Sequence, residues 1–254
     1  MPIREKRIYS GNYLEVEVYP ISKKEQQQKR RKKCKVSLPK QRNLNDKNAR
    51  KHLRRLINTN FTDFDIVLHL TYDNKNLPSS EEEAKRNLSN FFRRVKNYRK
   101  RNGLEDLKYI AVTEYKEATD DKRTKTRIHH HIVISGMDRD KLEELWGKGK
   151  ANADRLQSNE LGYEELANYI SKDPKGNKRW TQSRNIKQPT IKVNDHKYSL
   201  RKAWDLFYCQ GERKLLEDLY PGYTLSTFKS TVNDINAGCY SYIKMRKRNW
   251  KGEV

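Results

Sequence analysis

Two adjacent segments in the middle of the chain have the composition of β-strands. Residues 108–116 read KYIAVTEYK and residues 127–135 read RIHHHIVIS, and both are rich in β-branched and aromatic side chains. The ten residues between them, EATDDKRTKT, are polar and few enough to close a β-hairpin. A hairpin pairs its two strands antiparallel, so we expect a fold that contains an antiparallel sheet.

Helical and strand patterns flank this hairpin on both sides. Ser80 and Glu83 match a capping box, apolar residues follow at helical spacing, and Gly103 is a stop signal. The same periodicities predict strands at residues 13–19, 64–72 and 238–248, and helices at residues 46–57, 138–146, 163–172 and 199–208. Since no repeat or clear linker is visible, we expect an α+β fold in which a basic arm and helix (residues 1–60) precede one domain (residues 61–254).

The charge of the chain indicates a polyanionic partner. The formal charge is +23, from 56 Lys and Arg against 33 Asp and Glu residues, and residues 23–55 contribute +13 of it. Such an excess opposes compaction unless a polyanion neutralises it, so nucleic acid is the first candidate and an anionic membrane surface the second. The predicted helix in this region turns Arg54 and Arg55 away from its apolar residues. We expect the two arginines to bind phosphates, with a merely solvated helix face as the alternative.

No segment of the sequence indicates a membrane span or an oxidising compartment. No apolar run approaches the roughly 20 residues of a bilayer span, and the N-terminal residues lack the apolar stretch of a signal peptide. Cys34, Cys209 and Cys239 are isolated, which favours reduced thiols without a chemical role. We therefore expect a protein of the cytoplasm, without a membrane partner.

Three consecutive histidines lie within the second hairpin strand. Because side chains alternate faces along a strand, His129 and His131 share one face, and His130 lies on the other with neighbouring isoleucines. Two imidazoles two residues apart on a rigid strand can bind one divalent ion through neutral ring nitrogens. We expect Mg²⁺ or Mn²⁺ as the functional metal.

A carboxylate can complete this site. If Glu117 pairs with Thr126 across the hairpin, Glu114 lies opposite His129, close enough to share the ion. The alternative for Glu114 is a surface ion pair with Lys125 or Arg127. His69, on the strand predicted at residues 64–72, could approach the site, but we expect a hydrogen-bonded core histidine.

A candidate nucleophile follows the histidine strand by about 40 residues. In the predicted helix at residues 163–172, Tyr169 and Lys172 lie on one face. A nearby ammonium favours the phenolate, and it can also stabilise charge on a phosphodiester under attack. Tyr163 lies elsewhere around the helix and is poorly placed as a second nucleophile. A core tyrosine beside a surface lysine is the alternative for Tyr169.

These segments together resemble the HUH endonucleases, whose name denotes a His–hydrophobic–His motif. The likeness is to the rolling-circle replication initiators of phages and small plasmids, in the branch that includes the replication protein of filamentous phages. It is carried, in the family's order, by IVLHLTY (66–72), VTEY (112–115), IHHHIVIS (128–135), YISK (169–172) and KRWTQSRNIKQP (178–189). The resemblance implies a ferredoxin-like (RRM-like) palm whose central antiparallel sheet carries the histidine strand.

The resemblance also assigns roles to residues. His129 and His131 match the paired histidines, Tyr169 the nucleophile, and Lys172 the lysine that often follows it. Glu114 matches an acidic third ligand of some members. The chain departs from the family's pattern in the middle residue of the motif, His130, where a large apolar residue is usual.

Basic residues near these motifs are the expected DNA contacts. Besides Arg54 and Arg55 they are Arg127, in the histidine strand, and three residues of the basic segment at 178–189: Lys178, Arg179 and Arg184.

The expected activity is that of a rolling-circle replication initiator. Such an enzyme nicks single-stranded origin DNA, leaves a free 3′-OH and a 5′-phosphotyrosine, and later rejoins the ends. Gly147-Lys148-Gly149-Lys150 does not match a phosphate-binding loop, so a host helicase would unwind the origin hairpin for a host polymerase. The alternatives are a mobilisation relaxase, an HUH transposase, and, from another class, a basic nucleic-acid-binding protein without enzymatic activity.

Overall fold

A computed structural model describes residues 1–22, 39–116, 126–171, 179–232 and 238–248. The chain divides into two compact units. The central unit comprises residues 60–158 and 163–187, and the terminal unit comprises residues 1–59, 159–162 and 188–254. The residues from 188 onward thus group with the N-terminal residues, whereas the sequence pattern predicts that they belong to one domain starting at residue 61.

The described residues form a mixed α+β fold with two antiparallel five-stranded sheets and six helices. In the central unit the strand order is β6-β3-β5-β4-β7, an arrangement consistent with a ferredoxin-like palm. The elements of this unit are β3 (Ile66–Thr71), α2 (Glu81–Arg101), β4 (Tyr109–Lys116), β5 (Thr126–Ile134), α3 (Arg139–Glu144), β6 (Ala151–Arg155), α4 (Glu164–Ile170) and β7 (Thr181–Gln182).

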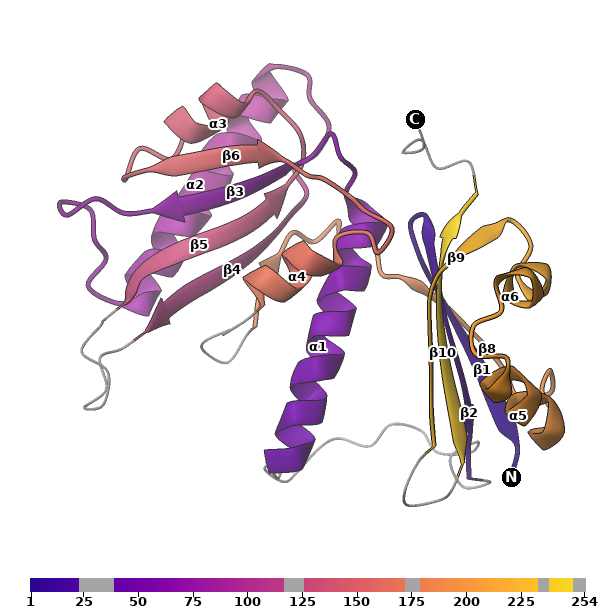
Figure 1. Ribbon diagram of the computed structural model, residues 1–254. Coiled ribbons are helices and arrows are strands. Elements are labelled where there is room, and N and C mark those ends of the chain that lie inside the picture. The colour runs from indigo at the N-terminus through magenta and orange to yellow at the C-terminus, as the bar shows by residue number, and fades with distance from the viewer. Residues whose placement is uncertain (23–38, 117–125, 172–178, 233–237, 249–254) are drawn as a thin grey trace. The chain divides into compact units, whose positions relative to one another are not determined.

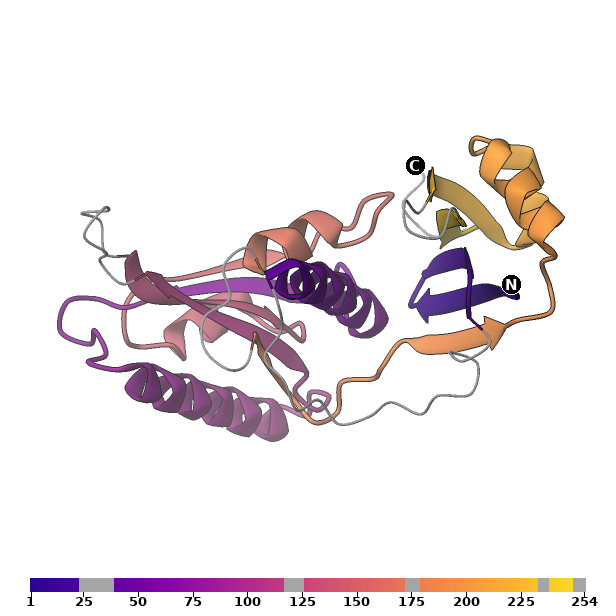
Figure 2. The same ribbon diagram turned by 90° about the horizontal axis from the view of Figure 1, so that it is seen from below.

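The two faces of the central sheet have different roles. Alternate residues of β3 (Ile66, Leu68 and Leu70) are fully buried in the core that the sheet forms with α2 and α3. Helix α2 begins at the predicted cap, because the Ser80 hydroxyl accepts a hydrogen bond from the Glu83 backbone N–H. Helix α4 lies on the opposite face (Figures 1 and 2). The other alternate residues of β3, Val67, His69 and Thr71, face this second side.

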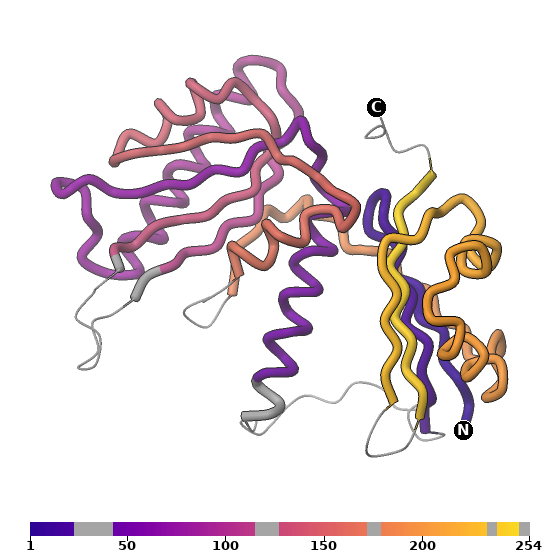
Figure 3. Tube along the Cα trace, viewed as in Figure 1, coloured from indigo at the N-terminus to yellow at the C-terminus, as the bar shows by residue number. Residues whose placement is uncertain are grey.

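The terminal unit contains the second sheet, with strand order β8-β1-β2-β10-β9. Strand β10, the last strand of the described chain, pairs antiparallel with β2 near its start, as the yellow and indigo segments of Figure 3 show. The elements of this unit are β1 (Ile3–Ser10), β2 (Tyr13–Pro20), α1 (Pro39–Asn60), β8 (Thr190–Asn194), α5 (Leu200–Tyr208), α6 (Arg213–Leu219), β9 (Tyr223–Val232) and β10 (Cys239–Lys247).

Helix α1 does not present its arginines to solvent as the sequence pattern predicts. Alternation in β2 places Glu15 and Glu17 on the sheet face opposite the apolar core formed with α5 and α6. Arg55 donates to the Glu15 carboxylate at 2.6 Å, and Arg54 forms an ion pair with the same carboxylate at 3.0 Å. Both arginines are buried. The expectation that Arg54 and Arg55 form a phosphate-binding surface is wrong, because their charges are neutralised inside the unit.

Most segments with a clear period are where the sequence predicts them. The strands predicted at residues 13–19, 64–72 and 238–248 are β2, β3 and β10, and the hairpin strands are β4 and β5. All the predicted helices are present, and α1 begins seven residues earlier than predicted, at Pro39. None of the helices in the described ranges has the length and apolar composition to cross a membrane.

Candidate metal centre

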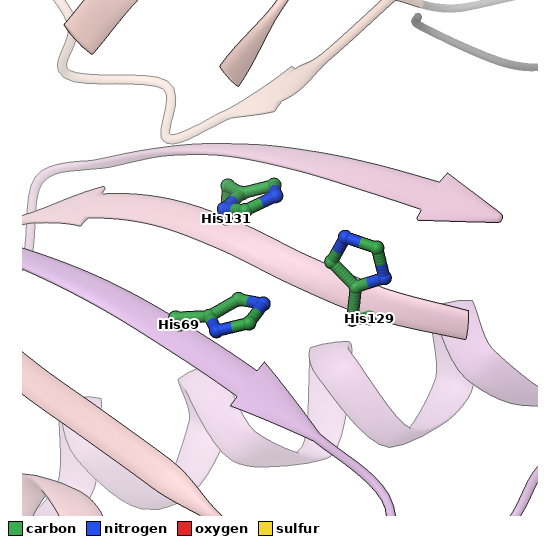
Figure 4. A group of neighbouring side chains, drawn as sticks. All are labelled: His69, His129 and His131. Carbon is green, nitrogen blue, oxygen red and sulfur yellow. The ribbon is translucent and has the colours of Figure 1, made fainter. Parts of the chain in front are cut away.

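Three histidines meet on the polar face of the central sheet. His129 and His131 extend from β5, and His69 extends from the neighbouring strand β3, where it pairs with His131 (Figure 4). One ring nitrogen from each lies within 4.8 Å of the others. The His69 and His131 rings are stacked with centroids 4.8 Å apart, and the His129 ring is edge-on to both. Three imidazoles can thus converge on one ion.

His69 is not the hydrogen-bonded core histidine that the sequence pattern predicts. Its Nε2 is buried, and it has no hydrogen-bond partner among the described residues. The alternation that buries Leu68 and Leu70 turns His69 to the opposite face, beside His131. Strand alternation in IVLHLTY gives only the face on which His69 lies, and the pairing of β3 with β5 brings that face beside His131.

Two histidines of this cluster, His69 and His131, are held in the neutral form. Burial, together with the nearby His69 and His129 rings, lowers the pKa of His131 to about 4. Burial and the His129 ring likewise lower the pKa of His69. At neutral pH both rings therefore keep a nitrogen lone pair, which is the form that binds metals.

The tautomer of His129 is fixed by the backbone of its own strand. Its Nδ1 lies 3.0 Å from the Arg127 carbonyl oxygen, which can only accept, so Nδ1 is the protonated nitrogen. The free Nε2 then faces the cluster. It lies 3.5 Å from Oε2 of Glu114, the same oxygen that lies 3.5 Å from Nε2 of His131.

Glu114 stands opposite His129, as predicted from the hairpin. The residue pairing at the end of the hairpin differs from the assumed one: Thr126 pairs with Lys116 and not with Glu117, and a register shift lies between Lys116 and Glu114. The carboxylate is only about a fifth exposed and lies toward the two histidines of β5. The cluster therefore contains three imidazoles and one carboxylate.

His130 lies on the other face of β5, as alternation predicts. It is fully buried beside Trp146, and its two ring nitrogens lie 2.9 Å from the hydroxyls of Tyr72 and Thr113. Burial lowers its pKa to about 3. A neutral ring with both nitrogens engaged is not free to bind a metal, so its role is to satisfy the polar groups of the core.

Helix α4 brings Tyr169 to the histidines. Ala167 and Ile170 are buried and anchor the helix, while the Tyr169 side chain is 62% exposed. Its ring is edge-on to that of His131, with centroids 5.1 Å apart. A phenol beside a candidate metal site and open to solvent is accessible to a large substrate.

The other predicted active-site residues lie apart from this cluster or outside the described ranges. Tyr163 is buried and donates its hydroxyl hydrogen to Asp63 at 2.8 Å, so it is unavailable as a second nucleophile. Lys172 lies outside the described residues.

The predicted DNA contacts are dispersed over the central unit. Arg127 is exposed and donates to the Asn74 side chain at 2.8 Å. Arg179 is half-buried, and Arg184 is exposed. Lys178 lies outside the described residues. Arg127 is the residue of this set that is nearest in sequence to the histidine cluster.

The region that contains the cluster is similar to a known family. Residues 65–174 match the family model described as replication-associated protein ORF2/G2P. The match includes all three histidines of the cluster, Glu114 and Tyr169, and it covers less than half of the chain. It supports a protein of the replication-initiator type. No curated protein and no solved structure matches the chain.

Proposed function

We propose that the protein is a metal-dependent endonuclease that nicks single-stranded origin DNA and so starts rolling-circle replication. One observation carries the proposal: three imidazoles and a carboxylate converge on one face of the sheet, beside an exposed tyrosine. The similarity to replication-associated proteins over the same residues supports it.

The residues of the cluster fit a divalent ion. Nε2 of His69 is buried without a partner, which is a cost unless a metal or another group engages it. Low pKa values keep His69 and His131 available as ligands, and Glu114 supplies a hard oxygen with negative charge. Such a nitrogen and oxygen set suits Mn²⁺ or Mg²⁺, and it would also accept Zn²⁺ or Ni²⁺. A bound ion would polarise the scissile phosphate and stabilise its developing charge.

The tyrosine would perform the covalent step. The Tyr169 oxygen attacks the phosphorus of the scissile phosphate as its own O–H bond breaks, and the proton passes to solvent. The bond between phosphorus and the 3′ oxygen breaks, which leaves a 3′-OH and a 5′-phosphotyrosine. Attack by a 3′-OH on that phosphotyrosine reverses the step and rejoins a strand. Lys172, the last residue of the segment YISK and three residues after Tyr169 in the sequence, is proposed to stabilise the phenolate.

The expected biological setting follows from this chemistry. The released 3′-OH can prime synthesis by a host polymerase, and a host helicase would open the duplex. These partners are proposals that rest on the nicking activity.

The decisive experiment detects the covalent adduct. The protein is incubated with Mn²⁺ and labelled single-stranded DNA that carries the origin, and the products are separated on a denaturing gel. We expect a labelled protein band with wild type and with Tyr163→Phe, and none with Tyr169→Phe. Tyr169→Phe should bind DNA like wild type, because only the nucleophilic oxygen is removed. An adduct that persists in Tyr169→Phe, or that peptide mapping places on another tyrosine, would refute the assignment.

A further inference from the structure

Helix α2 carries a set of exposed cations that the metal centre does not use. Its acidic residues are confined to the first turn, and no Asp or Glu occurs from Ala84 to Arg101. Two of its later arginines have structural roles, because Arg94 donates to carbonyls of the α3 end and Arg99 to the carbonyls of Glu105 and Gly136. Arg93 and Lys96 are exposed and have no such role. Their charge is thus available to a partner.

Arg93 and Lys96 form one wall of a groove at the edge of the central sheet. The groove has a volume of about 570 Å³, and its other wall is the segment after β7, with Ser183, Arg184 and Asn185. That wall is fixed to the sheet: Ser183 exchanges hydrogen bonds with the Tyr109 backbone at 3.0 and 3.1 Å, and the Asn185 amide donates to the Leu107 carbonyl. The groove is therefore built from ordered elements on both sides.

The charge of this groove favours an anion that is extended. Arg93 and Lys96 on one wall and Arg184 on the other oppose a single lining carboxylate, that of Asp106. None of the three cations forms an ion pair with a residue that the structure describes. Cations on both sides of an open groove suit a chain of phosphates better than one phosphate, because each wall can neutralise a different one.

The remaining lining residues favour a single strand of DNA over a duplex. Phe92 and Tyr109 stack at the groove with ring centroids 3.7 Å apart, and Gln182 and Asn185 add amide groups. Positive grooves with aromatic side chains are typical of single-strand binding surfaces. The backbone of one strand can follow such a groove, and a duplex is the alternative that the binding test below compares directly.

The groove is separate from the metal centre. Tyr109 lies five residues before Glu114 in β4, which corresponds to roughly 17 Å along the strand. Alternation also places Tyr109 on the sheet face covered by α2, whereas Glu114 lies on the face of the histidines. A strand held here would not be the cleaved phosphate itself but DNA that flanks it.

We propose that the groove between α2 and the segment after β7 binds the sugar-phosphate backbone of single-stranded DNA flanking the cleaved phosphate. Arg93, Lys96 and Arg184 are the phosphate contacts. The proposal rests on the proposed function only in taking DNA as the polyanion. It assigns the groove to affinity and not to the covalent step.

Binding measurements without metal separate this proposal from the nicking activity. Fluorescence anisotropy with labelled oligothymidylates of about 6 and about 20 nucleotides gives affinity as a function of salt for single strands. The groove variant is Arg93→Ala/Lys96→Ala. The matched control is Arg86→Ala/Arg101→Ala, which removes two exposed cations of the same helix outside the groove.

For the long oligonucleotide, the logarithm of the binding constant falls linearly with the logarithm of the salt concentration. We expect this slope to be shallower by about 1.4 in the groove variant, since each lost phosphate contact removes about 0.7. The control variant should change this slope much less. With the short oligonucleotide, the slopes of the groove variant and the control should differ less than with the long one. Equal slopes for groove variant and control would overturn the proposal. A larger loss for labelled duplex than for single strands would overturn the single-strand assignment. An absent Tyr169 adduct with these binding results intact would count against the nicking activity alone.

Discussion

The three histidines and Glu114 differ in what each contributes to metal binding. His69, His129 and His131 each offer a ring nitrogen to the same point, and His131 is the buried one of the three. Replacing any one by alanine removes a ligand and leaves a void, so Mn²⁺ affinity should fall by at least the roughly 10–100-fold that is typical when a residue that only orients a ligand is lost. Glu114→Gln should be milder, because its amide oxygen can still coordinate without the charge. Calorimetric titration of Mn²⁺ into each variant measures the order.

His130→Ala is the internal control for that series. It should leave Mn²⁺ binding largely intact and destabilise the fold by about 2–3 kcal/mol, because the hydroxyls of Tyr72 and Thr113 lose their buried partner. Chemical denaturation of wild type and variant gives this difference. If His130→Ala abolished metal binding while His129→Ala did not, the histidine face of β5 would be assigned incorrectly.

At the scale of elements, the loop between α3 and β6 holds the end of β3 beside the metal strand. Gly149 has φ of 151°, and a Cβ built on it would lie 2.5 Å from the Asp73 backbone nitrogen and 2.6 Å from the Thr71 carbonyl oxygen. The flanking lysines Lys148 and Lys150 accept backbone hydrogen bonds from Asp73 and Thr71. The glycines of this loop thus serve close packing of two backbones, in agreement with the absence of a phosphate-loop pattern.

Gly149→Ala should therefore destabilise the central unit more than Gly147→Ala. At Gly147, with φ of 59°, the nearest atom to a new Cβ is 3.8 Å away, so only backbone strain of about 1 kcal/mol is expected. At Gly149 the backbone must also move, which we expect to cost at least 1 kcal/mol more. The midpoints of denaturant unfolding compare the two variants, provided that the unfolding free energy depends equally steeply on denaturant concentration in both. Equal midpoints would show that the loop adapts without strain.

Regular periodicity made some elements predictable and left others hidden. The strands around the histidines and the helices with apolar stripes have a clear period, so their positions could be derived from the sequence. Strand β1 could not, because its core-facing positions include Glu5 and Arg7, which do not appear apolar in the sequence; they form an ion pair in which Glu5 is buried and Arg7 is half-buried. Strand β8 is an edge strand with every residue exposed, so no burial pattern marks it.

The local periodicity of the strands also made most of the candidate site predictable. The part that was missed depends on a contact between distant residues. Alternation alone separates His129 and His131 from His130, and hairpin pairing alone places Glu114. His69 required knowledge that β3 pairs with β5, a contact between residues about 60 positions apart that no local pattern encodes. Arg54 and Arg55 illustrate the converse: their partner Glu15 lies 40 residues away, so local charge predicted an exposed surface.

At the scale of the whole molecule, the chain has a formal charge of +23, and yet some of its acidic residues are buried and do not lie on the surface. Glu15 is fully buried in the terminal unit. Its burial alone would raise its pKa, but Arg54 and Arg55 lower the pKa from 4.5 to about 2. The carboxylate is thus charged in the folded unit wherever the protein is kept near neutral pH, and it offsets two buried guanidinium groups.

This arrangement predicts how the terminal unit responds to acid. A group whose pKa is depressed by folding adds stability above its unfolded pKa, near 4.5, and that stability is lost as pH falls through the folded pKa of about 2. Glu15→Gln removes the charge at every pH and leaves Arg54 and Arg55 buried without it, so it should cost about 3 kcal/mol at pH 7. The difference in unfolding free energy between wild type and Glu15→Gln should shrink as pH falls from about 4.5 toward 2, because wild type is then also losing the charge. Urea denaturation followed across this range measures it, with Glu25→Gln, in the basic N-terminal region, as a control that removes an acid from a different part of the chain. A difference that stays constant with pH would show that Glu15 stabilises the unit through packing and not through its charge.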